Sequence, residues 1–372
     1  MEALRLLGAG IRRTGEELIV TGTAGTLHAP AQEIFLGNNG TALRFLCSLV
    51  SLGEGKFVLT GSRRLCERPV GPLLEALAVL GVKTESRESK GYPPVTIYGG
   101  GLAGGAVTFT DTESSQYISS LLLSAPYARG DVTITIAGRA VSEPYIELTR
   151  RVMADFGVEV QRPAERVLRV SAGQRYRPAA YSIAGDASSA TYFFLAAALC
   201  GGEVRVLGLE GDSGQADLSF LELLARVGCR VARDEETVTV TGLGLTPGDL
   251  TVDMAGMPDA VPSLAVLAAF RPGRTQIRGA AHLRVKESDR LAALAAELNR
   301  IGAAAAETAD GLIIEGGRPL RGAEIETYDD HRIAMSFAVA GLALPGIAIC
   351  NPGCVAKSFP GFWEELAHLQ AH

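Results

Sequence analysis

The stretch GNNGTALRFLCSLVSLGEGKFVLTG, residues 37–61, sets the pattern of the whole chain. It reads as a small polar turn, an apolar helix, a turn with glycine and an alternating strand. The pattern returns in four later segments: SSQYISSLLLSAPYARGDVTITIAG, DASSATYFFLAAALCGGEVRVLGL, PDAVPSLAVLAAFRPGRTQIRG and DDHRIAMSFAVAGLALPGIAIC. Spacings of 76, 72, 73 and 71 residues separate the residues that open the five copies: Asn38, Ser114, Asp186, Asp259 and Asp330. We therefore predict an internal repeat of about 73 residues.

A second set of helices lies between these copies, and each ends in a glycine just before a strand. Spacings of 73, 76, 71 and 74 residues separate these glycines: Gly8, Gly81, Gly157, Gly228 and Gly302. Glycine just past a helix is typical of a left-handed C-terminal residue. Each repeat is therefore expected to be a small α/β module with two helices and several strands. The first module is expected to be incomplete, because one period before Asn38 falls ahead of Met1.

Composition bounds the class of protein. With 372 residues, 47% of them hydrophobic and 20% charged, the chain has enough apolar material for large cores and is not a disordered chain. We expect two domains, residues 1–183 and 184–372, with the boundary just before the third copy of the pattern. The net charge of −6 and the lack of a basic block argue against nucleic acid as a partner. The most apolar stretch, residues 334–350, is interrupted by glycine and proline, so no membrane span is expected.

Six cysteines are scattered without a CxxC pair, and the N-terminus lacks the apolar core of a secretory signal. This indicates reduced thiols in a cytoplasmic protein.

The small polar residues that open the first helices have two interpretations. Each is expected to cap its helix, and several such helix starts brought together would also bind an anion. Cations follow closely, in the segments ERP, RVKESDR, DDHR and AKSF. Lys286 and Arg290 are four residues apart, so a helix would place them on one face with Glu287 beside them. Such a group is either a site that holds or moves a proton, or a surface ladder of ion pairs.

The motifs LGNNGTALR, ERPVGPL, SSQYISSLLL, VSEPYIEL, GDASSATYF, PDAVPSLAVLAAF, RVKESDRL, DDHRIAMSF and AKSFP together resemble the EPSP synthase family, in its order and over nearly the whole chain. The resemblance implies an α/β protein with the two-domain enolpyruvyl transferase fold, an inside-out α/β barrel of repeated βαβαββ units. It implies transfer of the enolpyruvyl group of phosphoenolpyruvate to the 5-hydroxyl of shikimate 3-phosphate, with release of phosphate. No metal or organic cofactor is implied, and we expect a monomer.

The resemblance also implies roles for single residues. The catalytic groups would be Asp259, as the proton acceptor, with Glu287, His331 and Lys357 near the reacting carbons. The phosphoenolpyruvate site would contain Gly40, Arg68, Gln116, Arg290, Arg332 and Lys357, and Thr41 would also bind substrate. The shikimate 3-phosphate site would contain Ser114, Ser115, Gln116, Ser142, Tyr145, Asp259 and Lys286. Two phosphates and two carboxylates call for such a dense group of cations.

Some departures from the family pattern keep alternatives open. His282 stands where many members carry asparagine, and Phe45 follows Arg44 in place of a frequent proline. The family's N-terminal Lys-Ser segment has no match, which leaves a catalytically impaired or non-enzymatic form of the fold as one alternative. A second is UDP-N-acetylglucosamine enolpyruvyl transferase, which shares the fold and the donor.

Overall fold

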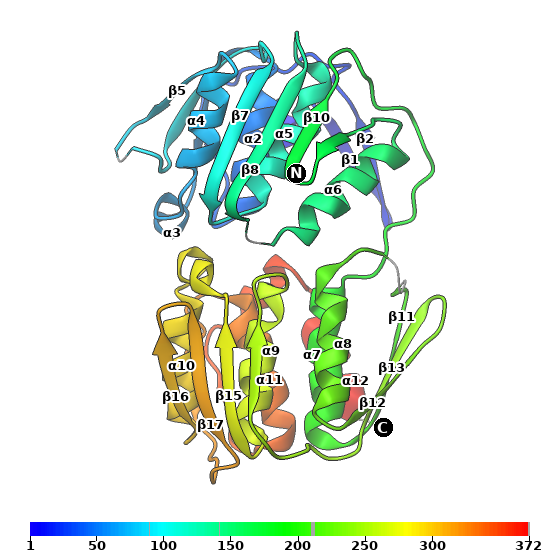
Figure 1. Cartoon of the computed structure of the whole chain (residues 1–372), viewed down its shortest axis with the longest axis vertical. Helices are drawn as coiled ribbons and strands as arrows, with labels where there is room; N and C mark the ends of the chain where they lie inside the picture. Colours follow the sequence, from blue (N-terminus) through cyan, green and yellow to red (C-terminus); the bar gives the residue numbers. More distant parts are fainter. Residues whose placement is uncertain (89, 141, 210–212, 371–372) are drawn as a thin grey trace. The chain divides into compact units, whose positions relative to one another are not determined.

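The computed structural model describes residues 1–88, 90–140, 142–209 and 213–370, and the chain separates into two compact units (Figure 1). The units are Met1–Tyr181 and Ser182–His372, so the division lies two residues before the boundary expected from the sequence. Each unit has its own continuous cluster of buried apolar side chains.

The first unit repeats one βαβαββ pattern. Its elements, in chain order, are α1 (Glu2–Leu6), β1 (Gly10–Thr14), β2 (Glu17–Thr21), β3 (Ile34–Phe35), α2 (Gly40–Ser51), β4 (Glu54–Thr60), α3 (Arg63–Cys66), α4 (Gly71–Val79), β5 (Lys83–Ser86), β6 (Val95–Gly100), β7 (Gly105–Thr112), α5 (Gln116–Ser124), β8 (Val132–Ala140), α6 (Pro144–Asp155), β9 (Gln161–Ala164) and β10 (Val167–Val170). Strands β3 to β6 form one sheet in the order β3-β4-β6-β5, and β7 to β10 form another in the equivalent order β7-β8-β10-β9. In both sheets the first pair is parallel and the other pairs are antiparallel. Before them, α1, β1 and β2 have the αββ order of the second half of the pattern.

The second unit continues the pattern. Its elements are α7 (Ala187–Cys200), β11 (Gly202–Leu207), α8 (Phe220–Arg226), β12 (Cys229–Arg233), β13 (Thr237–Gly242), β14 (Leu250–Asp253), α9 (Val261–Phe270), β15 (Gly273–Arg278), α10 (Arg290–Arg300), β16 (Ala304–Thr308), β17 (Gly311–Gly316), β18 (Glu324–Ile325), α11 (His331–Ala343), β19 (Ala348–Ile349) and α12 (Phe362–Gln370). Strands β14 to β17 form a complete copy in the order β14-β15-β17-β16. Among the described residues, the elements before this copy follow the order αβαββ, and the elements after it follow the order βαβα. The sequence predicted three βαβαββ units for this part of the chain.

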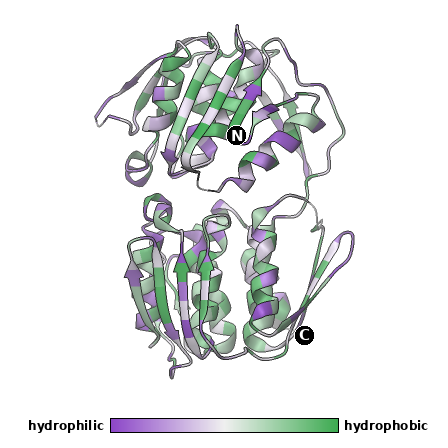
Figure 2. Cartoon of the chain, in the orientation of Figure 1, coloured by the Kyte–Doolittle hydropathy of each residue, from purple (hydrophilic) through white to green (hydrophobic). Residues whose placement is uncertain are grey.

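The first helices of the repeats lie inside and the sheets lie outside. Helices α7, α9 and α11 pack against one another, as do α2 and α5 in the first unit. Nine of the ten residues of α9 are buried, which is why this helix is apolar on every side (green in Figure 2) rather than along one stripe. The predicted inside-out arrangement of helices and sheets is therefore confirmed.

The left-handed glycines predicted from the repeat are confirmed, and hydroxyl pairs at the same period accompany them. The five glycines that end the second helices all have left-handed φ angles, between 80° and 107°. Helices one period apart are joined by buried hydroxyl groups: Ser120 Oγ lies 2.6 Å from Ser48 Oγ, and Thr191 Oγ1 lies 3.2 Å from Ser263 Oγ. Both pairs are 72 residues apart, so the period in the sequence is also the spacing of neighbouring helices.

Within the described ranges, no helix has both the length and the apolar character that a membrane span needs.

Candidate active site

Side chains from three repeats meet in the second unit. We call this group the Arg290 cluster, and it consists of Tyr192, Asp259, Glu287, Ser288, Arg290, Asp330, Arg332 and Lys357. Tyr192 lies in the second turn of α7, Lys357 lies in the turn before α12, and the others lie at or just before the starts of α9, α10 and α11. Within the second unit, polar residues at the starts of α9 and α11, the first helices of two repeats, therefore lie together with the start of α10.

Arg290 lies at the centre of the cluster, and its side chain is only 1% exposed. Its Nε donates to Asp330 Oδ2 at 2.8 Å, Nη1 to Asp259 Oδ1 at 3.0 Å and Nη2 to Glu287 Oε2 at 2.9 Å. Burial favours the neutral form, but the three carboxylates outweigh it and raise the pKa of Arg290 above its ordinary value. One buried guanidinium thus organises three acidic groups.

Asp330 joins the cluster to the start of α11. Its Oδ1 accepts from the Arg332 amide at 3.0 Å, which caps the helix, and its Oδ2 accepts from Ser288 Oγ at 3.0 Å. This side chain is fully buried. Burial raises the pKa of Asp330, but Arg290 outweighs that effect and lowers it, so the group stays ionised.

Arg332 and Asp259 form the second ion pair of the cluster. Arg332 Nη2 lies 2.8 Å from Asp259 Oδ2, and Nη1 donates to the Tyr192 hydroxyl at 3.3 Å. Burial raises the pKa of Tyr192 to about 12, so its hydroxyl keeps its proton. Burial alone would raise the pKa of Asp259, yet the charges of Arg332, Lys286 and Arg290 bring it well below its ordinary value. Lys286 therefore acts electrostatically on this site.

Lys357 reaches the cluster from the turn before α12. Its Nζ lies 2.7 Å from Glu287 Oε1, while the other oxygen of Glu287 accepts from Arg290. With Lys286 included, four cations face three carboxylates, so the group carries net positive charge and fits an anionic ligand.

His331 begins α11 and is 4% exposed. Its Nδ1 lies 3.8 Å from Asp330 Oδ1, too far for a hydrogen bond. Burial, together with Arg332 and Arg290, lowers its pKa to about 4. His331 is therefore a neutral imidazole near pH 7, and it adds no cation to the site.

One expectation about this region was wrong. Lys286 and Arg290 do not share a helix, because α10 begins at Arg290, where Asp289 caps it by accepting from the Ala292 amide at 3.1 Å. Arg284, in the same segment, lies apart from the cluster and binds Asp289 and the Thr308 carbonyl.

A second group of polar side chains lies in the first unit, at the starts of α2 and α5. We call it the Arg44 cluster, and it consists of Gly40, Thr41, Arg44, Arg68, Ser114, Ser115, Gln116 and Tyr117. Arg44 is 3% exposed, and its Nη1 donates to Gln116 Oε1 at 2.8 Å. Gln116 Nε2 donates in turn to Thr41 Oγ1 at 3.0 Å. The Arg44 guanidinium also lies 5.4 Å from the Tyr117 ring centroid.

Gly40 allows a second guanidinium to approach the start of α2. A Cβ atom at this position would lie 2.5 Å from Arg68 Cζ, closer than any real contact. Arg68 is 3% exposed and donates from Nη1 to the Asn38 carbonyl at 3.4 Å. The glycine is therefore required where the basic side chain covers the first turn of the helix.

The remaining predicted residues lie at the starts of α5 and α6. Ser114 and Ser115 are 4% and 3% exposed, and Ser114 Oγ accepts from the Gln116 amide at 3.3 Å. Ser142 has a left-handed φ of 57°, and its carbonyl accepts from the Tyr145 amide at 3.1 Å. Val141, the first residue of the VSEPYIEL motif, lies outside the described residues.

Sequence reasoning missed Arg44, Asp330, Tyr192 and Ser288 as site residues. Arg44 follows Gly40 by four residues, which is one helical turn, and this spacing was a usable signal. Asp330 was recognised only as a residue that opens a repeat. Tyr192 and Ser288 carry no signal of this kind, because their roles depend on partners far away in the sequence.

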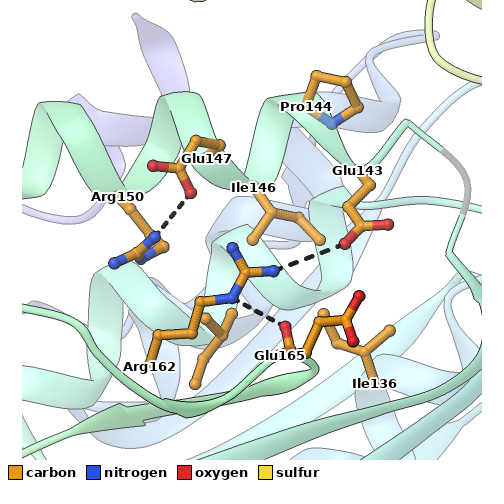
Figure 3. A pocket seen from close by; sticks show the side chains of 9 residues that line it. Ile136, Glu143, Pro144, Ile146, Glu147, Arg150, Arg162 and Glu165 are labelled. Carbon is orange, nitrogen blue, oxygen red and sulfur yellow. Dashed lines mark hydrogen bonds and ion pairs between the residues drawn. The ribbon is translucent and has the colours of Figure 1, made fainter.

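A pocket in the first unit is separate from both clusters (Figure 3). It has a volume of about 420 Å³, and its apolar lining consists of Ile136, Pro144, Ile146 and Leu168. Its arginines are already paired: Arg150 binds Glu147 at 2.7 Å, and Arg162 lies 4.0 Å from Glu143. With Glu165, three carboxylates outnumber two guanidinium groups, which does not suit an anionic ligand.

Comparison with known proteins gives one consistent family. The sequence model of EPSP synthase (3-phosphoshikimate 1-carboxyvinyltransferase) matches residues 1–366. A 3-phosphoshikimate 1-carboxyvinyltransferase of Methanoculleus marisnigri is 45% identical over 364 residues, which cover 98% of this chain and 86% of the relative. One of a Shewanella species is 42% identical, covering 100% of this chain and 88% of the relative.

A solved structure of EPSP synthase from Acinetobacter baumannii is similar with a TM-score of 0.76 and 30% identity, and covers 98% of this chain and 85% of that one.

Proposed function

Because the chain belongs to the EPSP synthase family, we propose that the Arg290 and Arg44 clusters hold its substrates. The chain is an enzyme of the alkyl-transferase class, and it transfers the enolpyruvyl group of phosphoenolpyruvate to shikimate 3-phosphate in the shikimate pathway. We propose that the two compact units are the two domains of the family fold.

The buried guanidinium of Arg290 carries the proposal for the second unit. Arg290 is a cation with 1% exposure, and it lies among three carboxylates and two further cations. Burying so many charges has a large desolvation cost, which favours a role in binding a charged ligand. We assign Arg290, Arg332 and Lys357 to the phosphate and carboxylate of phosphoenolpyruvate, since guanidinium groups bind both in a bidentate manner.

For the first unit, we assign Gly40, Thr41, Arg68 and Gln116 to the same donor. Arg44 is added to this group because it holds the Gln116 amide in place through its hydrogen bond of 2.8 Å.

The hydroxyl groups at the starts of α5 and α6 are assigned to shikimate 3-phosphate. The residues concerned are Ser114, Ser115, Gln116, Ser142 and Tyr145, with Lys286 from the second unit. Short hydroxyl side chains and amide groups at a helix start suit the oxygens of a phosphate.

In the reaction, the acceptor hydroxyl oxygen bonds to C2 of phosphoenolpyruvate, its proton leaves, and C3 gains a proton. Loss of phosphate and of a C3 proton then restores the double bond. We assign removal of the hydroxyl proton to Asp259. A carboxylate with so low a pKa is a weak base, so we propose that the bound anions draw Arg332 away from Asp259 and raise its basicity.

The pair of Lys357 and Glu287 is assigned to proton transfer at C3. Their 2.7 Å contact lets an ammonium and a carboxylate exchange a proton when the donor arrives. His331, a neutral imidazole next to Asp330, is assigned to hydrogen bonding rather than to charge.

The assay measures phosphate release with phosphoenolpyruvate and shikimate 3-phosphate. We expect turnover with this acceptor and none with UDP-N-acetylglucosamine; the reverse result would support the second enzyme class, and no turnover with either would support a non-enzymatic form. We expect Arg332→Met to raise the KM for phosphoenolpyruvate at least about tenfold, from the loss of charge-assisted hydrogen bonds. Arg274→Met, which removes an exposed ion pair on β15, is the matched control. An Arg332→Met variant with unchanged KM would contradict the assignment.

We also propose that the protein is a monomer of the cytoplasm. All six cysteines are free, and a chain with many free thiols fits the reducing cytoplasm. The monomeric state stays a prediction, which sedimentation of the purified protein tests.

A further inference from the structure

The loop that leads into α11 has an unusual backbone. Tyr328 and Asp329 are consecutive residues with left-handed φ angles of 54° and 56°. For a bulky side chain such as tyrosine this conformation is rare, and it persists only where the surroundings impose it. The next residue is Asp330, the carboxylate that binds Arg290 and caps α11. The conformation of this loop therefore decides where the centre of the Arg290 cluster lies.

Glu297 of α10 holds the loop from the other side. Its side chain is completely buried, and its Oε1 accepts from the Tyr328 hydroxyl at 2.9 Å. Its Oε2 accepts from the Glu326 amide at 3.2 Å and lies 3.0 Å from Arg300 Nε. The two loop donors stand on either side of Thr327, so one carboxylate fixes both ends of the turn.

Tyr328 is a reliable donor in this arrangement. Burial, and then its hydrogen bond to Glu297, raise its pKa to about 12. Asp329 is held separately, by Asn351 Nδ2 at 3.1 Å from its Oδ1.

Arg290 and Glu297 are seven residues apart in α10, which places them two turns apart on the same side of the helix. The loop contacts both: Asp330 binds Arg290, and Tyr328 binds Glu297. These two attachments fix the position of the loop along the helix.

We propose that Glu297 is a positioning residue for the enolpyruvyl transfer: through Tyr328 and the Glu326 amide, it holds Asp330 in place against Arg290 and the start of α11. The inference rests on the proposed role of the Arg290 cluster. Glu297 itself contacts the Tyr328 hydroxyl, the Glu326 amide and Arg300, so it acts on the site through the loop.

The test uses two variants of different severity in the whole 372-residue chain. Glu297→Gln keeps the shape of the side chain but replaces one carboxylate oxygen by an amide NH2 group. This group cannot accept the hydrogen bond that the oxygen accepts in the wild type. Tyr328→Phe removes only the hydroxyl group and remains informative if the first variant folds poorly. We expect each to lower kcat/KM for phosphoenolpyruvate about tenfold, the effect of one charge-assisted hydrogen bond.

Asn299→Ala is the matched control. Asn299 lies on the same helix and makes two side-chain hydrogen bonds, with the Ala305 carbonyl at 2.8 Å and the Ala305 amide at 2.9 Å. This variant loses stability without touching the loop, so we expect kcat/KM within twofold of the wild type.

A double-mutant cycle separates positioning from general destabilisation. If Glu297 acts through Asp330, adding Glu297→Gln to Asp330→Asn should lower kcat/KM little beyond the loss from Asp330→Asn alone. The inference would be overturned, with the proposed site left intact, if the two losses in kcat/KM multiplied in full in the double variant. The same holds if the Glu297 and Tyr328 variants fold and keep kcat/KM within twofold of the wild type. An Asp330→Asn variant with wild-type kinetics would instead overturn the proposed site, and this inference with it.

Discussion

Replacing Arg290 by methionine should destabilise the second unit and make its stability depend on pH in a new way. The side chain that is lost has 1% exposure and three acidic partners. Two of those partners keep a cation: Asp259 retains Arg332, and Glu287 retains Lys357. Fully buried Asp330 loses its arginine and keeps the hydrogen bonds from Ser288 and from the amide of Arg332. Breaking one buried ion pair costs about 3–5 kcal/mol, and we expect a loss of that size at pH 7.

The pH dependence follows from Asp330. In the wild type, Arg290 keeps the pKa of Asp330 below its unfolded value, so its contribution to stability is full above that value and is lost only when the pH falls through the folded pKa. In the variant, burial is opposed by the two hydrogen bonds from Ser288 and the Arg332 amide but no longer by Arg290, so we expect the folded pKa of Asp330 to lie above the unfolded one. The charged Asp330 carboxylate then destabilises the fold at pH 7. This destabilisation decreases when the carboxylate takes up a proton at lower pH. The difference between variant and wild type should therefore shrink between pH 7 and pH 5.

The single tryptophan makes the measurement specific. Trp363 lies in α12 of the second unit, where its Nε1 donates to the Pro352 carbonyl at 3.0 Å. Urea unfolding followed by tryptophan fluorescence thus reports on the unit that carries the change. Arg274→Met, with a half-exposed ion pair of 3.7 Å, should cost less than about 1 kcal/mol. The reasoning is refuted if Arg290→Met costs no more than this control, or if its cost is the same at both pH values.

Further changes test single contacts of the two clusters. Gly40→Ala should displace the Arg68 guanidinium, because the new Cβ atom would lie 2.5 Å from its Cζ, and raise the KM for phosphoenolpyruvate about tenfold in steady-state assays of phosphate release. Gln116→Leu removes the links to Arg44 and Thr41, so both substrates should bind more weakly by calorimetry; unchanged affinity for both would contradict its assigned place. The His331 ring should show no titration between pH 8 and pH 5.5 by NMR, since its pKa is about 4 in the folded chain. Because the unfolded ring binds its proton more readily, His331 should lower stability as the pH falls from about 6.5 towards 4, and His331→Gln should weaken that dependence.

The repeat made most of the fold predictable. Polar openings and glycine endings recur with one period, and each marks a helix boundary whose backbone requirement is local. The same argument located Arg290, Arg332 and Lys357, since each follows or precedes a helix start. It failed for Lys286, because Asp289 caps α10 and the helix begins at Arg290, four residues later than a face shared with Lys286 would need. The aspartate in the segment SDR is a typical N-cap residue and could have predicted that the helix begins at Arg290.

Other parts of the site depend on contacts that no local pattern encodes. Glu297 stands in AAELNRIG and reads as an ordinary polar residue of a surface helix, yet it is completely buried. Its partners, Tyr328 and the Glu326 amide, come from a loop 29 to 31 residues away. Tyr192 and Arg332 are 140 residues apart, so only the packing of α7 beside α11 brings them together.

The buried hydroxyl pairs between inner helices bear on the history of the chain. Ser48 with Ser120, and Thr191 with Ser263, recur in different units with the same separation of 72 residues. Two adjacent modules in each unit thus share one way of meeting their neighbour, which is what duplication of a single ancestral module would leave behind. Modules built on a common interface are candidates for exchange, so chimeras that swap one inner helix for its counterpart offer a route to ask how far the copies have diverged.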